Sequence, residues 1–235
     1  MKAPLPLLPA AALALVLCVA AAAWAQAAAA QVTRAGDAIV FEGRIDAASA
    51  QRFVQLLQDP AVTRLVITSR GGLVAPALDM AAAIAARQLD LEVPVACFSS
   101  CANYLFPAAR HKRLGHPQAV AWHGNMAHVL YLQQTGQGRW NARQLADARQ
   151  LARREALLYA RLGVDGFACW FGKIAPYEVE DFYSLSPADL AGFGIRDVVV
   201  QPGATAPPAA PEVQAISVDW RTIEAIRPSV DLSDP

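Results

Sequence analysis

Residues 65–87 read LVITSRGGLVAPALDMAAAIAAR, and this stretch decides the fold class. Its first four residues are apolar or β-branched, which predicts a short strand buried on both faces of a parallel sheet. Residues 69–72 predict a tight turn, and residues 74–87 predict a helix that buries Leu78, Met80 and Ile84. A strand, a turn and a helix in this order make up the first half of a β-α-β unit.

The same alternation continues on both sides of this stretch. Asp46 is placed as the N-cap of an earlier helix, and Gly163 as the cap that ends a long later one. The expected strands lie at 38–43, 65–68, 93–96, 119–122 and 195–200, and the expected helices at 46–57, 74–87, 99–108, 141–162 and from Ser186 onward. Helices that alternate with short apolar strands imply crossover connections. We therefore expect an α/β fold of repeated β-α-β units with a mostly parallel sheet, plus a long helix in the C-terminal half.

The N-terminus has the features of a signal peptide. Lys2 precedes an uncharged apolar run at 10–23, and the small-x-small pattern at 23–25 predicts cleavage after Ala25. The run is shorter than the roughly 20 residues of a membrane span, so an uncleaved anchor is the less favoured alternative. Cys18 follows a leucine rather than a small residue, which argues against a lipid anchor. We expect a periplasmic or secreted protein with no stable membrane span after cleavage.

The predicted domain organisation has four parts. The signal peptide covers residues 1–25, and a single α/β domain covers 26–201. A Pro/Ala linker follows at 202–212, and a C-terminal tail occupies 213–235. The length left after cleavage is enough for one sizeable core. The sequence leaves open whether the tail docks on the domain.

Composition excludes some partners. The chain has 20 basic and 20 acidic residues, so it lacks the positive charge excess typical of nucleic-acid binding. Its histidines lack metal-ligand spacing, and we expect neither a metal nor a cofactor. Cys97 and Cys101 lie close enough in sequence to pair across a turn, and an oxidising compartment permits a disulfide. Three cysteines remain after cleavage, so at least one, such as Cys169, has no partner within the chain.

Residues with catalytic potential follow three of the predicted strands. They are the Gly71-Gly72 pair, the serines Ser99 and Ser100, and His123. In open parallel sheets, functional residues gather at the carboxyl ends of the strands. A serine nucleophile, a histidine base and backbone N–H donors together suit acyl transfer. The alternatives are a serine N-cap, a strand-end histidine and a simple strand-to-helix turn.

Four sequence blocks carry a resemblance to a known family. SRGGLV at 69–74, CFSSCA at 97–102, WHG at 122–124 and SPADLAGFGI at 186–195 resemble the Clp protease proteolytic-subunit family, within the ClpP/crotonase-like superfamily. The closest likeness is to an exported, poorly characterised branch with a C-x-S-x-C element. The blocks follow the family's order over most of the mature chain. Arg70 stands where the family usually has proline, Cys101 replaces a methionine and Ala109 replaces a glycine.

The resemblance implies a role for each matching residue. Ser100 falls on the nucleophile and His123 on the base, with Ser99 as the alternative nucleophile. The oxyanion-hole N–H groups would come from Gly71 and Cys101. Asp181 is the nearest match to the acid of the triad, with Glu178 and Glu180 as rivals.

Three functions are compatible with these residues. The first is an exported serine hydrolase, specifically a peptidase acting on a peptide or protein. The second is a non-catalytic binding or assembly protein that retains the fold, which the uncertain acid and the altered motif residues favour. The third is a crotonase-type enzyme acting on a thioester, which export argues against. Relatives in this superfamily commonly form rings or trimers, so a homo-oligomer is expected by analogy.

Overall fold

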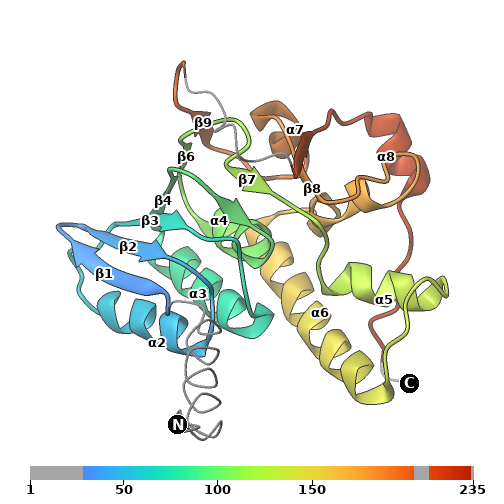
Figure 1. Ribbon diagram of the computed structural model, residues 1–235, viewed down its shortest axis with the longest axis horizontal. Helices are drawn as coiled ribbons and strands as arrows, with labels where there is room; N and C mark the ends of the chain where they lie inside the picture. Colours follow the sequence, from blue (N-terminus) through green and yellow to red (C-terminus); the bar gives the residue numbers. More distant parts are fainter. Residues whose placement is uncertain (1–28, 204–211, 234–235) are drawn as a thin grey trace, which may run out of the picture.

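A computed structural model of the chain describes residues 29–203 and 212–233. The predicted signal peptide and most of the predicted linker lie outside these residues. The described part is α/β, with a six-stranded sheet in the order β1-β2-β3-β4-β6-β9 (Figure 1). The strands are β1 (Gln31–Ala35), β2 (Ala38–Glu42), β3 (Arg64–Thr68), β4 (Asp90–Val93), β6 (Lys112–Leu114) and β9 (Val198–Val200). All neighbours are parallel except β1 and β2, which confirms the prediction of a mostly parallel sheet.

Strand β1 was not anticipated from the sequence. It forms an antiparallel hairpin with β2 through the two residues Gly36 and Asp37, and Gly36 has a φ of 62°. Two-residue hairpin loops favour glycine because their backbone needs positive φ. The hairpin places β1 at one edge of the central sheet.

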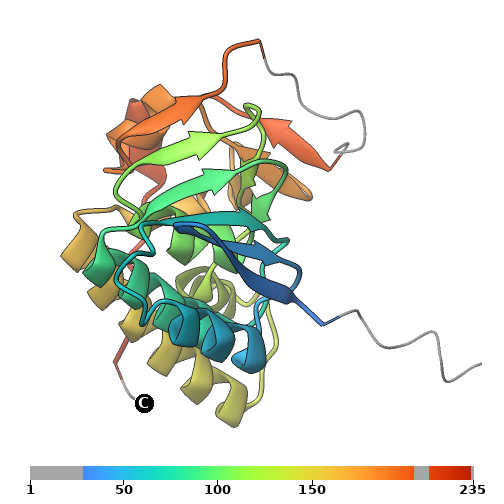
Figure 2. The same ribbon diagram turned by 90° about the vertical axis from the view of Figure 1, so that its left-hand side faces the viewer.

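Three helices form a layer on one side of the central sheet (Figures 1 and 2). They are α2 (Ala47–Leu56), α3 (Val74–Arg87) and α6 (Ala142–Leu162). Asp46 caps α2 in a capping box with Ser49, and Gly163 ends α6 in the left-handed conformation. The sequence predicted all three helices to within a residue or two of their ends, because each combines an apolar face with a recognisable cap or turn.

The two faces of the central sheet differ in polarity. Along β3, Leu65 and Ile67 are fully buried, while Val66 is only partly buried. The partly exposed face carries charged pairs between strands, including Arg64 with Glu92 at 3.1 Å. The expectation that this strand is buried on both faces was therefore wrong.

A second, smaller set of strands contains the segments that lead to Ser99 and His123. Strand β5 (Cys97–Phe98) pairs with β7 (Val120–Ala121), and β8 (Phe182–Ser184) pairs with β10 (Val213–Ala215). A bridge between Trp122 and Tyr183 joins the two pairs, and a bridge between Ser69 and Cys97 links them to the end of β3. The strand predicted at 119–122 belongs here, since β6 takes the place beside β4 in the central sheet.

The remaining helices and the tail complete the domain. The α-helices are α4 (Phe106–Ala108), α5 (Met126–Gln134), α7 (Pro187–Gly192) and α8 (Trp220–Ile226). They are accompanied by the π-helix η2 (Cys101–Leu105) and the 3-10 helices η3 (Gly166–Cys169) and η4 (Phe171–Lys173). The tail docks on the domain, because Val213 and Ile223 are buried and the Trp220 ring lies 4.9 Å from that of Phe193. No helix in the described ranges is long and apolar enough to cross a membrane.

Candidate active site

Ser99 occupies a sharp bend between strand β5 and the helical segment that follows. Its φ is 54°, a left-handed conformation that is uncommon for a residue with a side chain. The Ser99 N–H donates to the Ala121 carbonyl at 3.1 Å, and its carbonyl accepts from Asn103 N–H at 2.8 Å. Such backbone strain is of order 1–3 kcal/mol and persists where the surrounding structure imposes it. The bend therefore fixes the backbone from which the Ser99 side chain projects.

His123 meets this serine from the end of β7. Its Nε2 lies 2.8 Å from Ser99 Oγ, within hydrogen-bonding distance. The His123 ring also packs on Phe182, with 4.7 Å between ring centroids. Partial burial, and secondarily the positive charge of Lys173, lower the pKa of His123 below its ordinary value. A lowered pKa keeps the imidazole neutral at pH 7, so that Nε2 is able to accept the hydroxyl proton.

Ser100 points its hydroxyl to a different partner. The residue is buried, and its Oγ donates a 2.8 Å hydrogen bond to the carbonyl of Gly72. No hydrogen bond joins Ser100 to His123 in the described part of the chain. Ser100 thus ties the helix start to the Gly-Gly turn, and the structure pairs His123 with Ser99.

The Gly71-Gly72 turn packs directly on the Ser99 bend. A Cβ on Gly71 would lie 2.7 Å from the Phe98 carbonyl oxygen, 2.8 Å from Ser99 Cβ and 3.0 Å from Ser100 N. Gly71 also has a φ of 92°, which strains any residue with a side chain. Its N–H donates to Ser69 Oγ at 3.1 Å. The missing side chain at Gly71 therefore keeps the space beside Ser99 and the Ser100 N–H open.

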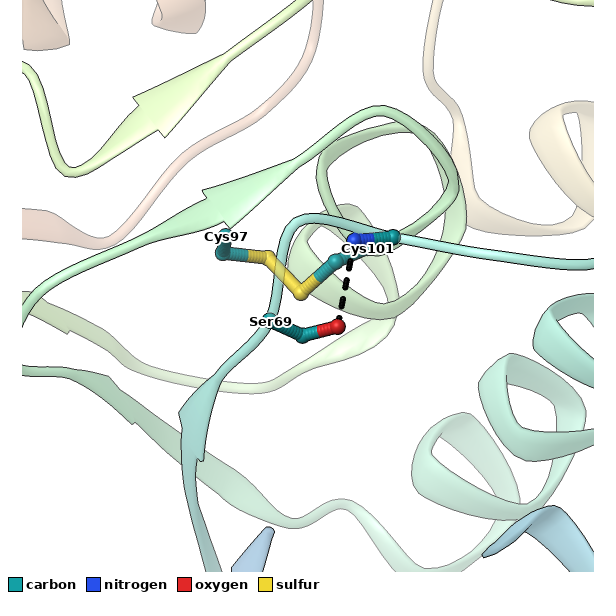
Figure 3. Close-up of a disulfide and its surroundings, with 4 residues drawn as sticks. Ser69, Cys97 and Cys101 are labelled. Carbon is teal, nitrogen blue, oxygen red and sulfur yellow. Dashed lines mark hydrogen bonds between the residues drawn. A yellow bond between two sulfur atoms is a disulfide. The ribbon is translucent and has the colours of Figure 1, made fainter. Parts of the chain in front are cut away.

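A disulfide between Cys97 and Cys101 spans the bend, as the sequence spacing allowed. Figure 3 shows this bond beside Ser69, whose hydroxyl accepts a hydrogen bond. Cys101 is consequently not a free thiol. Cys169 is free but buried, and burial raises the pKa of its thiol far above the ordinary value. Neither sulfur is suited to act as a nucleophile.

Among residues 29–203 and 212–233, no carboxylate forms a hydrogen bond or ion pair with His123. Asp181 is exposed, as are Glu178 and Glu180, and no hydrogen bond from these side chains to His123 occurs among the described residues. The segment is instead held by Lys173, whose Nζ donates to the main-chain carbonyls of residues 179, 180 and 181. A cation rather than an acid thus lies on this side of the histidine, a feature that the sequence motifs did not indicate.

Two hollows adjoin the Ser99–His123 pair. The larger has a volume of about 600 Å³ and is lined by the Gly71-Gly72 turn, Arg70 and Phe182. The smaller has about 280 Å³ and is lined by Asn103, His128 and apolar residues of α5. Burial lowers the pKa of His128 to about 4, so this histidine is neutral at pH 7. Ser99 and His123 line both hollows, so the pair is reached from each of them.

A buried acid lies behind the smaller hollow. Glu155 of α6 accepts hydrogen bonds from the Tyr104 hydroxyl and, at 3.0 Å, from Met126 N–H at the start of α5. Burial raises the pKa of Glu155 to about 7. Sequence analysis does not single out this residue, because the helix from 142 to 162 is rich in exposed charges. Glu155 links α6 to the segments that follow both Ser99 and His123.

The chain matches no model of a known protein family, and no curated protein sequence matches it significantly. In the part of the chain that the structure describes, no group of three or more His, Cys, Asp or Glu side chains is arranged to hold a metal ion.

Proposed function

We propose that this chain is an exported serine hydrolase of the peptidase type, with Ser99 as nucleophile and His123 as general base. The observation that carries the proposal is the 2.8 Å contact between His123 Nε2 and Ser99 Oγ, with Ser99 held at positive φ between a strand and a helix. Serine nucleophiles of other hydrolases occupy strained strand-to-helix turns of this kind.

The proposed reaction runs in two halves. His123 Nε2 takes the proton from Ser99 Oγ as that oxygen bonds to the substrate carbonyl carbon. The bond from this carbon to the leaving nitrogen or oxygen then breaks, and the leaving group takes the proton from His123. In the second half, water gives a proton to His123 and adds to the acyl carbon. Ser99 Oγ leaves and recovers its proton, and the acid product is released.

Backbone N–H groups beside Ser99 would stabilise the oxyanion. Ser100 and Cys101 stand in the first turn after the bend, where N–H groups have no partner within the helix. The open space at Gly71 gives access to the Ser100 N–H. The Gly71 N–H is occupied by Ser69 Oγ and would contribute only after leaving it. With Ser99 as nucleophile, we therefore assign the main donor to Ser100, the residue that follows it.

Two further observations support export and kinship with the Clp proteases. The Cys97–Cys101 disulfide suits an oxidising compartment such as the periplasm, and an N-terminal signal peptide would deliver the chain there. The sheet is mostly parallel, and the Gly-Gly turn precedes the serine bend along the chain, as the resemblance implies. A peptide or protein substrate and a homo-oligomeric state follow from the same resemblance, and light scattering on the purified protein tests the second.

A specific observation favours the alternative, a binding or assembly protein that retains the fold. His123 has no carboxylate partner among the described residues, whereas an acid normally orients the base of a serine hydrolase. Under the first proposal, packing on Phe182 takes over this orienting role. Under the second, Ser99 and His123 are remnants of an ancestral site.

Labelling with a fluorophosphonate probe separates the two functions. The probe is applied to the mature protein and to its Ser99→Ala, Ser100→Ala and His123→Ala variants, with circular dichroism to confirm folding. We expect labelling of the wild type and of Ser100→Ala, and loss of labelling in the other two. A folded wild type that does not label would support the assembly function. Labelling lost only in Ser100→Ala and His123→Ala would return the nucleophile to Ser100.

A further inference from the structure

The larger hollow beside Ser99 is lined by positive charge. Its lining includes Arg44 and Arg70 together with the Gly-Gly turn, and it includes no carboxylate. Lys173 adds a third positive charge close enough to His123 to lower the pKa of that imidazole. A cleft lined by one sign of charge attracts ligands of the opposite sign. The charge around the candidate nucleophile therefore favours an anionic substrate.

Arg70 is held in position by two aromatic rings. Its guanidinium carbon lies 5.3 Å from the ring centroid of Phe98 and 5.9 Å from that of Phe182. Phe98 directly precedes Ser99, and Phe182 packs on His123. The arginine is thus anchored by the same residues that flank the catalytic pair. A planar guanidinium fixed in this way suits recognition of a carboxylate.

Within the chain, Arg70 already binds a carboxylate. Glu212 forms an ion pair with Arg70, and the Arg70 guanidinium lowers the pKa of the Glu212 carboxyl. Glu212 comes just before β10, where Val213 packs in one cluster with Phe98. The Glu212 carboxylate therefore reaches Arg70 from a neighbouring segment at the rim of the hollow. Because this pair is partly exposed to solvent, an exchange for another carboxylate is inexpensive.

We propose that the hollow accepts acyl substrates that carry a carboxylate next to the scissile bond, as acidic peptides do, and that Arg70 binds this carboxylate in exchange for Glu212. The inference rests on the proposed serine hydrolase function. It makes Arg70 a specificity-determining residue and Glu212 an internal competitor for the same guanidinium.

Two isosteric substrates test the inference. The 4-nitrophenyl esters of N-acetyl-glutamate and N-acetyl-glutamine differ in charge and hardly in shape. The kcat/KM of the mature protein should be about 3- to 10-fold higher for the glutamyl ester than for the glutaminyl ester. This is the range expected for a single ion pair that is exposed or partly desolvated. This ratio should approach 1 in Arg70→Gln and at high salt, where screening weakens exposed charge pairs.

Further variants distinguish substrate binding from a purely structural ion pair. Glu212→Gln should lower the KM for the glutamyl ester, because the competitor is removed. If the pair only fastened the tail, this KM would not fall. Arg143→Gln on α6 removes one positive charge outside both hollows, and it should leave both esters unaffected.

The result also separates this inference from the proposed function. Equal kcat/KM for the two esters, in a wild type that fluorophosphonate labels at Ser99, would overturn the charge preference and leave the hydrolase intact. If neither ester is turned over, titration of each ester into Ser99→Ala measures binding directly. Tighter binding of the glutamyl ester that depends on Arg70 would support the inference, and equal or absent binding of both would overturn it.

Discussion

Replacing Gly71 by alanine tests the packing of the glycine turn on the serine bend. The new Cβ would lie 2.7 Å from the Phe98 carbonyl oxygen and 2.8 Å from Ser99 Cβ, both shorter than normal contacts. The φ of 92° adds strain of about 1–2 kcal/mol for any residue with a side chain. With the forced shift of the bend, we expect the free energy of unfolding to fall by about 3 kcal/mol. That loss corresponds to a decrease in Tm of roughly 6–12 °C for a domain of this size.

The matched control for this substitution is Gly36→Ala in the β1–β2 hairpin. Gly36 also has a positive φ, of 62°, but a Cβ there would meet nothing within 4 Å. We expect this control to lower the free energy of unfolding by only about 1 kcal/mol. The two variants therefore separate backbone strain from steric overlap.

Two measurements complete the Gly71 test. Urea unfolding gives the stability of each variant, and fluorophosphonate labelling reports the state of Ser99. Because the added methyl group would stand 3.0 Å from Ser100 N, we expect Gly71→Ala to label at least about 100-fold more slowly than the wild type, while Gly36→Ala labels normally. A Gly71→Ala protein as stable as Gly36→Ala, with unchanged labelling, would refute the described packing.

Three further predictions concern the disulfide and two titrating groups. Replacing both Cys97 and Cys101 by serine opens a loop of about five residues, so the free energy of unfolding should fall by about 2 kcal/mol. Fluorophosphonate labelling of Ser99 should also slow. If the wild type labels at the same rate after full reduction of the disulfide, the bond does not position Ser99. Because the pKa of Glu155 is raised to about 7, the folded protein retains a proton that the unfolded chain loses above a pH of about 4.5. This carboxyl therefore stabilises the fold most below the unfolded pKa, and that stability is lost as the pH rises to 7, by at most about 1.4 kcal/mol per pH unit. Glu155→Gln should flatten this dependence in urea unfolding between pH 5 and 8, and an equal slope in both proteins would contradict the assignment. Because the pKa of His123 is lowered, the fall of the labelling rate in acid should have its midpoint below pH 6.5. Lys173→Met should move this midpoint to higher pH, because it removes a positive charge that lowers the pKa. An unchanged midpoint would show that Lys173 does not act on the histidine.

Much of the fold could be predicted because its signals are local. Asp46, Asn141 and Gly163 cap their helices through contacts within a few residues, and the apolar periodicity between the caps is clear. The hairpin strand β1 was missed because its sequence lacks a run of strand-forming residues. Strand β7 lies within the strand predicted at 119–122, but its pairing with β5 was missed because each strand is only two residues long and the pairing joins distant segments.

The candidate site could be predicted to its neighbourhood but not to the residue. The chain order places Gly71, the two serines and His123 at strand ends, and the structure brings these segments together. Ser99 and Ser100 are chemically identical neighbours, however, and the choice between them depends on the φ of Ser99 and on the hydrogen bond from Ser100 to Gly72. Neither quantity is encoded by residue type alone. The acid prediction at Asp181 relied on register in a loop, where sequence spacing fixes little.

The interlocking of the Gly-Gly turn with the serine bend limits how the two segments vary during evolution. The Gly72 carbonyl accepts a hydrogen bond from Ser100, and Gly71, which has no side chain, packs against Ser99. Gly72 and Ser100 are 28 residues apart in the sequence. A substitution in the Gly-Gly turn alters the effect of a substitution in the serine bend, so the changes in the free energy of unfolding from the two substitutions do not add. Neutral drift at either segment therefore depends on the residues already present at its partner, and single-position mutational scans will underestimate the variants that paired changes allow.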